Sequence, residues 1–114
     1  MYEINIVKKL IVFISIVFSI AYSEIVYRVP IEGVIDLGLP PYVKRVIKEA
    51  EASNISAIVF EINTFGGRVD AATQIKDARL SSEVQTIAFI NRRAISAGAL
   101  ISLSCEKVFM TGGG

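Results

Sequence analysis

"SAIVFEINTFGGRVDAATQIKDARLSS", residues 56–82, is the stretch of this sequence that decides the fold. Residues 56–63 carry a short apolar run, which is typical of a buried strand. Residues 64–67, with two consecutive glycines, are predicted to form a turn. Apolar residues then recur at helical spacing, which predicts a helix over 68–82. A strand, a tight turn and a helix in this order indicate one unit of an α/β fold.

The flanking sequence repeats the same order. Strands are predicted at 24–36 and 84–91, and a further strand begins at 107–110. Helices are predicted between them, at 40–52 and 96–106. The first of these is rich in Val and Ile but is interrupted by Pro30 and Gly33, so we expect either a strand pair or one kinked edge strand. The alternation predicts an α/β fold with a mostly parallel sheet and right-handed crossovers.

Two predicted loops, residues 63–70 and 91–98, follow strands and lead directly into helices. Ligands of parallel α/β sheets bind beyond the carboxyl ends of the strands, so these loops face each other if their strands are neighbours. The pair Gly66-Gly67 lets the backbone approach a ligand closely, and free N–H groups at a helix start stabilise negative charge. Ser96 opens the second helix. Together the loops supply a serine oxygen and oriented donors, which are the two parts that acyl transfer needs.

Each of these motifs also has a purely local interpretation. A glycine pair between a strand and a helix is usually a turn, and a serine before a helix is usually an N-cap worth about 1 kcal/mol. Ala94 stands where a G-x-S-x-G nucleophile elbow has its first glycine. Spacing alone therefore leaves both interpretations of Ser96 open, as a helix cap or as a nucleophile.

Composition excludes several classes of function. The chain has 12 Lys and Arg against 11 Asp and Glu, and this balance argues against a nucleic-acid partner. The sequence has no histidine, which excludes a Ser-His-Asp or Cys-His triad within it and argues against a zinc site. Cys105 is the single cysteine and sits in an apolar stretch, so we expect a buried, inert thiol. We expect no cofactor and no metal.

Residues 1–23 have the pattern of a secretory signal peptide. A lysine pair at 8–9 precedes the apolar run 10–20, and residues 21–23 carry the small side chains of a cleavage site. The run is shorter than the roughly 20 residues that a spanning helix needs. We therefore expect export with cleavage before Glu24, and an uncleaved membrane anchor is the alternative.

Taken together, the two loops resemble those of the membrane-bound, ClpP-class serine proteases at the N-terminal end of NfeD-like proteins. The matching stretches are "IEGVID", "PPYVKRVIKEAE", "AIVFEINTFGGRVDAATQI" and "TIAFINRRAISAGALISLSCEKVFM". The specific part is the glycine pair followed by R-x-D, with S-A-G-A-L about thirty residues later. ClpP itself and signal peptide peptidase A are more distant relatives by the same pattern.

The resemblance implies a ClpP/crotonase-type fold built from repeated β-β-α units with a mostly parallel sheet. It also implies a Ser-Lys serine endopeptidase in which Ser96 is the nucleophile. The N–H groups of Gly67 and Ala97 then form the oxyanion hole, and Gly66 supports the loop. The sequence departs from the family at Phe65, where the family usually has proline.

The resemblance implies a general-base lysine several tens of residues beyond Ser96. Lys107 lies at the far end of the predicted helix, and Lys76 lies midway along another helix, so neither suits this role. We therefore expect residues 24–114 to be the N-terminal portion of a peptidase domain that is incomplete at its C-terminus and inactive alone.

The resemblance further implies a protein or peptide substrate, with a stomatin-like membrane protein as one candidate, together with homo-oligomerisation and membrane association of the parent protein. The signal pattern adds an extracytoplasmic location. Two alternatives stay open: a non-catalytic, membrane-associated protein-binding role, and a crotonase-type acyl-CoA enzyme, against which the export signal argues.

Overall fold

The computed structural model describes residues 2–20 and 24–113. Its elements follow in the order α1 (Tyr2–Ile20), β1 (Val26–Ile35), α2 (Leu39–Ala52), β2 (Ala57–Gly67), α3 (Val69–Leu80), β3 (Gln85–Ala94), α4 (Ala97–Ser104) and β4 (Lys107–Met110). Within the described residues the strands form one sheet in the order β1-β2-β3-β4, and all neighbouring strands are parallel.

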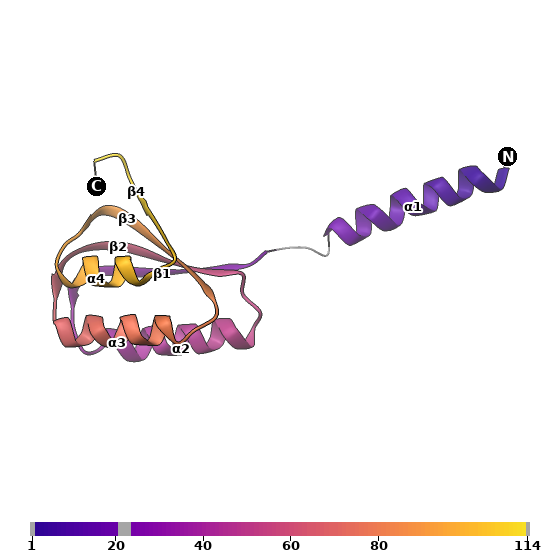
Figure 1. Cartoon of the computed structure of the whole chain (residues 1–114). Helices are drawn as coiled ribbons and strands as arrows, with labels where there is room; N and C mark the ends of the chain where they lie inside the picture. Colours follow the sequence, from indigo (N-terminus) through magenta and orange to yellow (C-terminus); the bar gives the residue numbers. More distant parts are fainter. Residues whose placement is uncertain (1, 21–23, 114) are drawn as a thin grey trace.

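The helices α2, α3 and α4 lie on one side of the sheet (Figure 1). α4 packs on β2 and β3 and also contacts α3, which in turn packs against α2. This arrangement confirms the predicted α/β class with a parallel sheet. One helix follows each of the long strands β1, β2 and β3. Register shifts between Glu32 and Val34 and between Ile62 and Thr64 interrupt the strand pairing.

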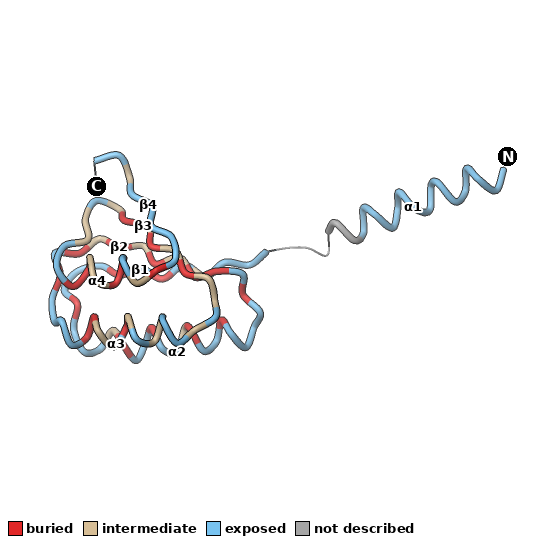
Figure 2. The backbone as a smooth tube through the Cα atoms, in the orientation of Figure 1, coloured by how far each residue is buried: buried red, intermediate tan, exposed pale blue. Residues whose placement is uncertain are grey.

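The core lies between the sheet and its helices (Figure 2). Along β2, alternate residues such as Ile58, Phe60 and Ile62 are almost fully buried. They belong to one apolar cluster with Ala72 and Ile75 of α3. Because side chains alternate across a strand, this pattern fixes which face of β2 receives the helices.

The opposite face of the sheet carries a polar contact that spans three strands. Glu61 of β2 accepts hydrogen bonds from Arg28 of β1 and from the amide of Asn91 of β3, the latter at 3.2 Å. These two bonds, with that of Arg28 the stronger, hold the pKa of the Glu61 carboxyl below its usual value. The contact ties together strands that come from distant parts of the sequence.

Residues 24–36 form one strand rather than a strand pair. β1 is the edge strand, it pairs with β2, and its register shifts at Gly33, where φ is +71°. The kinked edge strand is therefore the correct one of the two alternatives.

The predicted glycine turn at 64–67 is wrong, because β2 continues to Gly67 and pairs through its last residues with Val34 and Ile35 of β1. A Cβ on Gly67 would lie 2.2 Å from the carbonyl oxygen of Ile35. The glycine at 67 therefore serves close approach of two strands. Glycine is favoured both in tight turns and where two backbones approach closely, so a glycine pair alone does not distinguish the two.

The predicted loop at 91–98 is also shorter than expected. β3 continues to Ala94, and the register shift places three of its residues, 91–93, beside a single residue of β2. Arg92 has φ of +83° in this bulge. The connection to α4 is thus reduced to Ile95 and Ser96, and a bulge of this kind is typical of strands next to functional sites.

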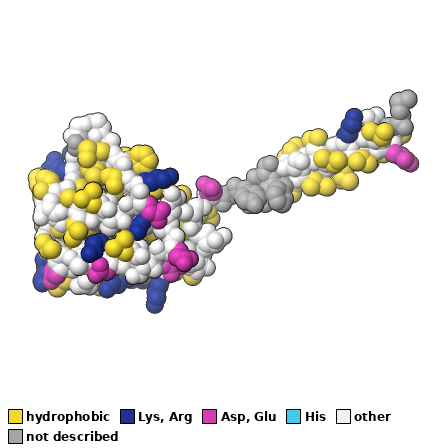
Figure 3. All heavy atoms as spheres, viewed as in Figure 1, with side chains coloured by type: hydrophobic (Ala, Val, Ile, Leu, Met, Phe, Trp, Pro, Cys, Tyr) yellow, Lys and Arg dark blue, Asp and Glu magenta, His cyan; other side chains and the backbone are white. Residues whose placement is uncertain are grey.

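The helix α1 stands apart from the sheet and its helices (Figure 1), and apolar side chains cover most of the face in view (Figure 3). Within residues 2–20 and 24–113, no helix combines the length and the apolar character needed to cross a membrane. The predicted cleavage site at 21–23 lies outside the described residues.

Candidate active site

Ser96 occupies a tight connection between β3 and α4. Its backbone has φ of +54° and ψ of −116°, a conformation that costs a non-glycine residue about 1–3 kcal/mol. The residue is exposed and its side chain makes no capping hydrogen bond to α4. Its carbonyl oxygen accepts hydrogen bonds from the N–H groups of Ala99 and Leu100 at 2.9 and 3.2 Å. Ser96 therefore stands at the N-cap position without capping the helix by its hydroxyl.

Gly66 packs directly against this connection. A Cβ on Gly66 would lie 2.9 Å from the carbonyl oxygen of Ile95, 3.0 Å from Cβ of Ser96 and 3.5 Å from the amide nitrogen of Ala97. The backbone of Gly66 also has φ of +113°. Only glycine fits both the space and the backbone conformation, so the two stretches that the sequence analysis paired do meet in space.

Gly67 and Ala97 lie on either side of this contact. The N–H of Arg68, the residue after β2, donates to the carbonyl of Ile35 at 2.8 Å. Ala97 is buried and is the first residue of α4, so its N–H has no acceptor within the helix. The four residues named from the sequence, Ser96, Gly66, Gly67 and Ala97, thus come from the ends of β2 and β3 and the start of α4.

The side chain of Thr64 lies beneath this cluster and was missed in the sequence. Thr64 is 1% exposed. Its hydroxyl accepts a hydrogen bond from the N–H of Gly66 at 2.9 Å and donates one to the carbonyl of Gly33. Its own carbonyl accepts the N–H of Ile95 at 3.1 Å. A threonine two residues before a glycine at the end of an apolar strand is the only sequence signal for it.

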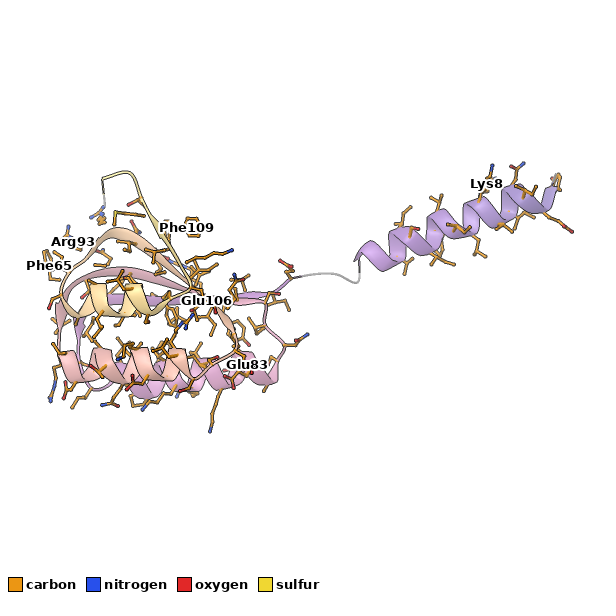
Figure 4. All side chains as sticks on the ribbon, in the orientation of Figure 1. Lys8, Phe65, Glu83, Arg93, Glu106 and Phe109 are labelled. Carbon is orange, nitrogen blue, oxygen red and sulfur yellow. The ribbon has the colours of Figure 1, made fainter. Side chains whose placement is uncertain are left out.

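Phe65 and Arg93 lie next to each other on the exposed side of this region (Figure 4). The guanidinium of Arg93 stands over the Phe65 ring, 4.3 Å from its centroid, and the ring is 71% exposed. A cation over an aromatic face is attractive, so the pair adds a contact of about 0.5–1 kcal/mol between the ends of β2 and β3.

Of the two lysines considered as a base, Lys107 lies far from Ser96 and Lys76 is engaged by a carboxylate. Lys107 pairs with Ile87 at the opposite end of β3, which puts it roughly 20 Å from Ser96 along the strand. Its neighbour Glu106 lies at the far end of the sheet from Phe65 and Arg93 (Figure 4). Lys76 lies on α3 with its ammonium 3.3 Å from the Asp77 carboxylate.

Two further expectations concern metals and the thiol. In the part of the chain that the structure describes, no group of three or more His, Cys, Asp or Glu side chains is placed to hold a metal ion. Cys105 is buried, as predicted, and burial raises the pKa of its thiol. A thiol with a raised pKa is a poor nucleophile, which agrees with the expected inert role.

Comparison with known proteins shows which protein family the chain matches. The family model described as NfeD1b, N-terminal domain, matches residues 25–114. The chain is 35% identical over 94 residues to the membrane protein NfeD1b of Bacillus subtilis, covering 82% of this chain and 22% of that protein. It is 32% identical over 112 residues to the membrane-bound protease PH1510 of Pyrococcus horikoshii, covering 96% of this chain and 25% of that protein.

Solved structures agree with these relatives. The 1510-N membrane protease specific for a stomatin homolog, from Pyrococcus horikoshii, superposes with a TM-score of 0.73 at 33% identity, over 80% of this chain and 47% of that one. ClpP1 from Listeria monocytogenes gives a TM-score of 0.66 at 28% identity, over 69% and 46% of the two chains. A lysine-to-alanine mutant of 1510-N has been solved in complex with a substrate peptide. The chain thus spans about a quarter of these two relatives and less than half of the solved chains.

Proposed function

Because the chain belongs to the NfeD1b N-terminal domain family, we propose that residues 24–114 supply the nucleophile and the oxyanion donors of a Ser-Lys serine peptidase. The observation that carries this proposal is the packing of Gly66 against Ser96 and Ala97, since it joins a serine and backbone donors in one place. The similarity of the chain to the membrane protease 1510-N also supports the proposal.

In the proposed reaction, Ser96 Oγ attacks the carbonyl carbon of the scissile peptide bond and passes its proton to a neutral lysine. The carbonyl oxygen becomes an oxyanion, which the N–H groups of Gly67 and Ala97 stabilise. Collapse of this intermediate breaks the C–N bond, and the leaving amine takes the proton from the lysine. Water then hydrolyses the ester on Ser96, with the same lysine as base.

The backbone geometry supports the choice of Gly67 over Gly66 as donor. Consecutive N–H groups of an extended strand point to opposite edges. Arg68 donates towards β1, and Gly66 donates to Thr64, which faces the same strand through Gly33. The alternation directs the Gly67 N–H to the other edge, where β3 and α4 lie.

The geometry of Ser96 supports its role as nucleophile. A strained residue between a strand and a helix is the device by which other hydrolases expose a serine oxygen above a sheet. Ser96 has the positive φ, the exposure and the uncapped side chain that such a device requires.

The proposed base is a lysine other than Lys76 and Lys107, contributed by a part of the protein outside the described residues. Such a lysine has to be neutral, and burial among apolar groups lowers a lysine pKa for this purpose. The lysine-to-alanine mutant of the relative, solved with a substrate peptide, supports a lysine in this role.

We place the substrate among membrane-associated proteins, with a stomatin-like protein as the first candidate. The support is the specificity of 1510-N for a stomatin homolog, together with the membrane association named for NfeD1b and PH1510. The signal pattern of residues 1–23 supports action on the extracytoplasmic side.

Peptide cleavage tests the proposal. The protein expressed from its gene is incubated with a peptide library derived from a stomatin-like protein of the same cell, and products are identified by mass spectrometry. We expect Ser96→Ala to lower cleavage by at least about 10³-fold with an unchanged unfolding midpoint. Ser104→Ala is the matched control, because its hydroxyl donates to the Ile101 carbonyl at the other end of α4. Equal turnover by Ser96→Ala would refute the assignment, and peptide binding without cleavage by the wild type would indicate a binding role instead.

A further inference from the structure

Thr64, together with Gly66, links the two halves of the proposed site. It lies on β2, two residues before Gly66, and is almost fully buried. From its hydrogen bonds and packing we infer that Thr64 is a positioning residue. Its hydroxyl orients the peptide between Gly66 and Gly67, so that the Gly67 N–H faces the oxyanion. This inference rests on the proposed function and adds a residue to it.

The hydroxyl of Thr64 uses its donor and one of its acceptor lone pairs. A hydroxyl has one donor and two acceptor lone pairs. The donor goes to the carbonyl of Gly33 in the β1 bulge, and the oxygen accepts the N–H of Gly66 at 2.9 Å. The Gly66 N–H is thereby held on the β1 side of the strand. The same hydroxyl lies 3.4 Å from the carbonyl oxygen of Gly66, and this carbonyl shares its peptide plane with the Gly67 N–H. The hydroxyl therefore contacts both peptides that flank Gly66, whose φ of +113° no side chain restricts.

The main chain of Thr64 places the other half of the site. Its carbonyl accepts the N–H of Ile95 at 3.1 Å, and Ile95 precedes Ser96. Ser96 is then held from its other side by the bonds of its carbonyl to the first turn of α4. One residue thus fixes the donor strand through its side chain and the nucleophile connection through its backbone.

The methyl group of Thr64 has a separate role. A Cβ on Gly98 of α4 would lie 2.4 Å from Thr64 Cγ2, so the methyl fills the space that this glycine leaves and seats α4 on β2. The hydroxyl therefore forms hydrogen bonds and the methyl packs against α4, and substitution can remove either one alone. Serine keeps the hydroxyl and loses the methyl, and valine keeps the shape and loses the hydroxyl.

The experiment measures kcat and KM for peptide cleavage by the protein expressed from its gene, with Thr64→Val and Thr64→Ser. The matched control is Thr86→Val, which removes an equally buried threonine hydroxyl from the start of β3, where it bonds to Arg79. We expect Thr64→Val to lower kcat by about 10- to 100-fold, less than the loss of an oxyanion donor itself, with KM changed less than threefold. Thr64→Ser keeps kcat within about threefold of wild type although its melting temperature falls. Thr86→Val lowers the melting temperature and leaves kcat unchanged.

Three results would overturn the inference. The first is a folded Thr64→Val protein with wild-type kcat. The second is a folded Thr64→Ser protein whose kcat falls by about 10-fold or more, which decides the matter if the valine variant does not fold. The third is a kcat loss in Thr86→Val equal to that in Thr64→Val, since the effect is then one of stability. Absence of Ser96-dependent cleavage in the wild type would instead refute the proposed function, and the inference with it.

Discussion

Ser96 combines a strained backbone with an exposed side chain that does not cap its helix. Strain of this kind persists only where the surroundings fix it. Here the bond from Ile95 to Thr64 fixes one side, and the bonds from α4 to the Ser96 carbonyl fix the other. The conformation therefore lowers the stability of the fold and keeps the Ser96 hydroxyl exposed. This combination is expected of a nucleophile and not of a structural cap.

This strain predicts that Ser96→Gly stabilises the fold. Glycine adopts φ of +54° freely, so the substitution removes the strain, and the extra freedom of glycine in the unfolded chain cancels only part of the gain. We expect the free energy of unfolding to rise by about 1 kcal/mol relative to Ser96→Ala, measured by urea denaturation. A Ser96→Gly protein less stable than Ser96→Ala would show that the residue is not strained.

At this scale the sequence pointed to Ser96 and Gly66 as candidate site residues, and the structure brings them into contact. Both were visible in the sequence because each stands at a predicted junction between a strand and a helix, whereas Thr64 was missed. Thr64 is recognisable only from its partners, since Gly33 is 31 residues away and Gly98 belongs to another helix. No local pattern reports contacts of that kind.

At the scale of elements, the approach of β1 and β2 decides the position of the donor strand. Gly67 pairs with Ile35, and there is no room for a side chain between them. The glycine that allows this close approach is also the residue of the proposed oxyanion donor.

Gly67→Ala is therefore expected to separate the ends of the two strands. The new Cβ meets backbone atoms of Ile35, which cannot move as a side chain can, so we expect a loss of more than about 2 kcal/mol in the free energy of unfolding. Gly112→Ala is the matched control, because a Cβ there meets nothing within 4 Å. Denaturation curves of the two variants check this, and equal stability would contradict the close approach.

The contact of Glu61 with Arg28 and Asn91 predicts a pH dependence. The pKa of Glu61 is lowered in the folded protein, so its contribution to stability is present above the pKa of the unfolded chain and is lost as the pH falls through the lower folded value. We expect the unfolding midpoint of the wild type to fall more steeply below about pH 4 than that of Glu61→Gln. Parallel curves for the two proteins between pH 7 and pH 3 would refute this coupling.

For elements, periodicity predicted every helix and strand of the domain within a few residues at most ends. The errors lie where β2 and β3 meet the site. Both strands continue beyond their apolar stretches, to Gly67 and to Ala94. They do so because their glycine and polar residues still pair with neighbouring strands. Strand pairing across the sheet decided these ends, and pairing is not a property of one segment.

For the whole molecule, the described residues form a sheet with helices on one side and an exposed edge. β4 leaves Val108, Phe109 and Met110 between 44% and 56% exposed at that edge. The composition, the absence of histidine and the order of the elements were enough to predict the α/β class and to point away from a histidine-based triad. The relative positions of β2, β3 and α4, on which the candidate site depends, required the structure.

Active-site labelling tests the central claim most directly. The protein expressed from its gene is treated with a fluorophosphonate, which reacts with activated serines, and the modified residue is located by peptide mass spectrometry. The account predicts one adduct at Ser96 in the wild type and none in Ser96→Ala. Labelling that persists in Ser96→Ala, or a wild-type protein that cleaves peptides while Ser96 stays unmodified, would contradict it.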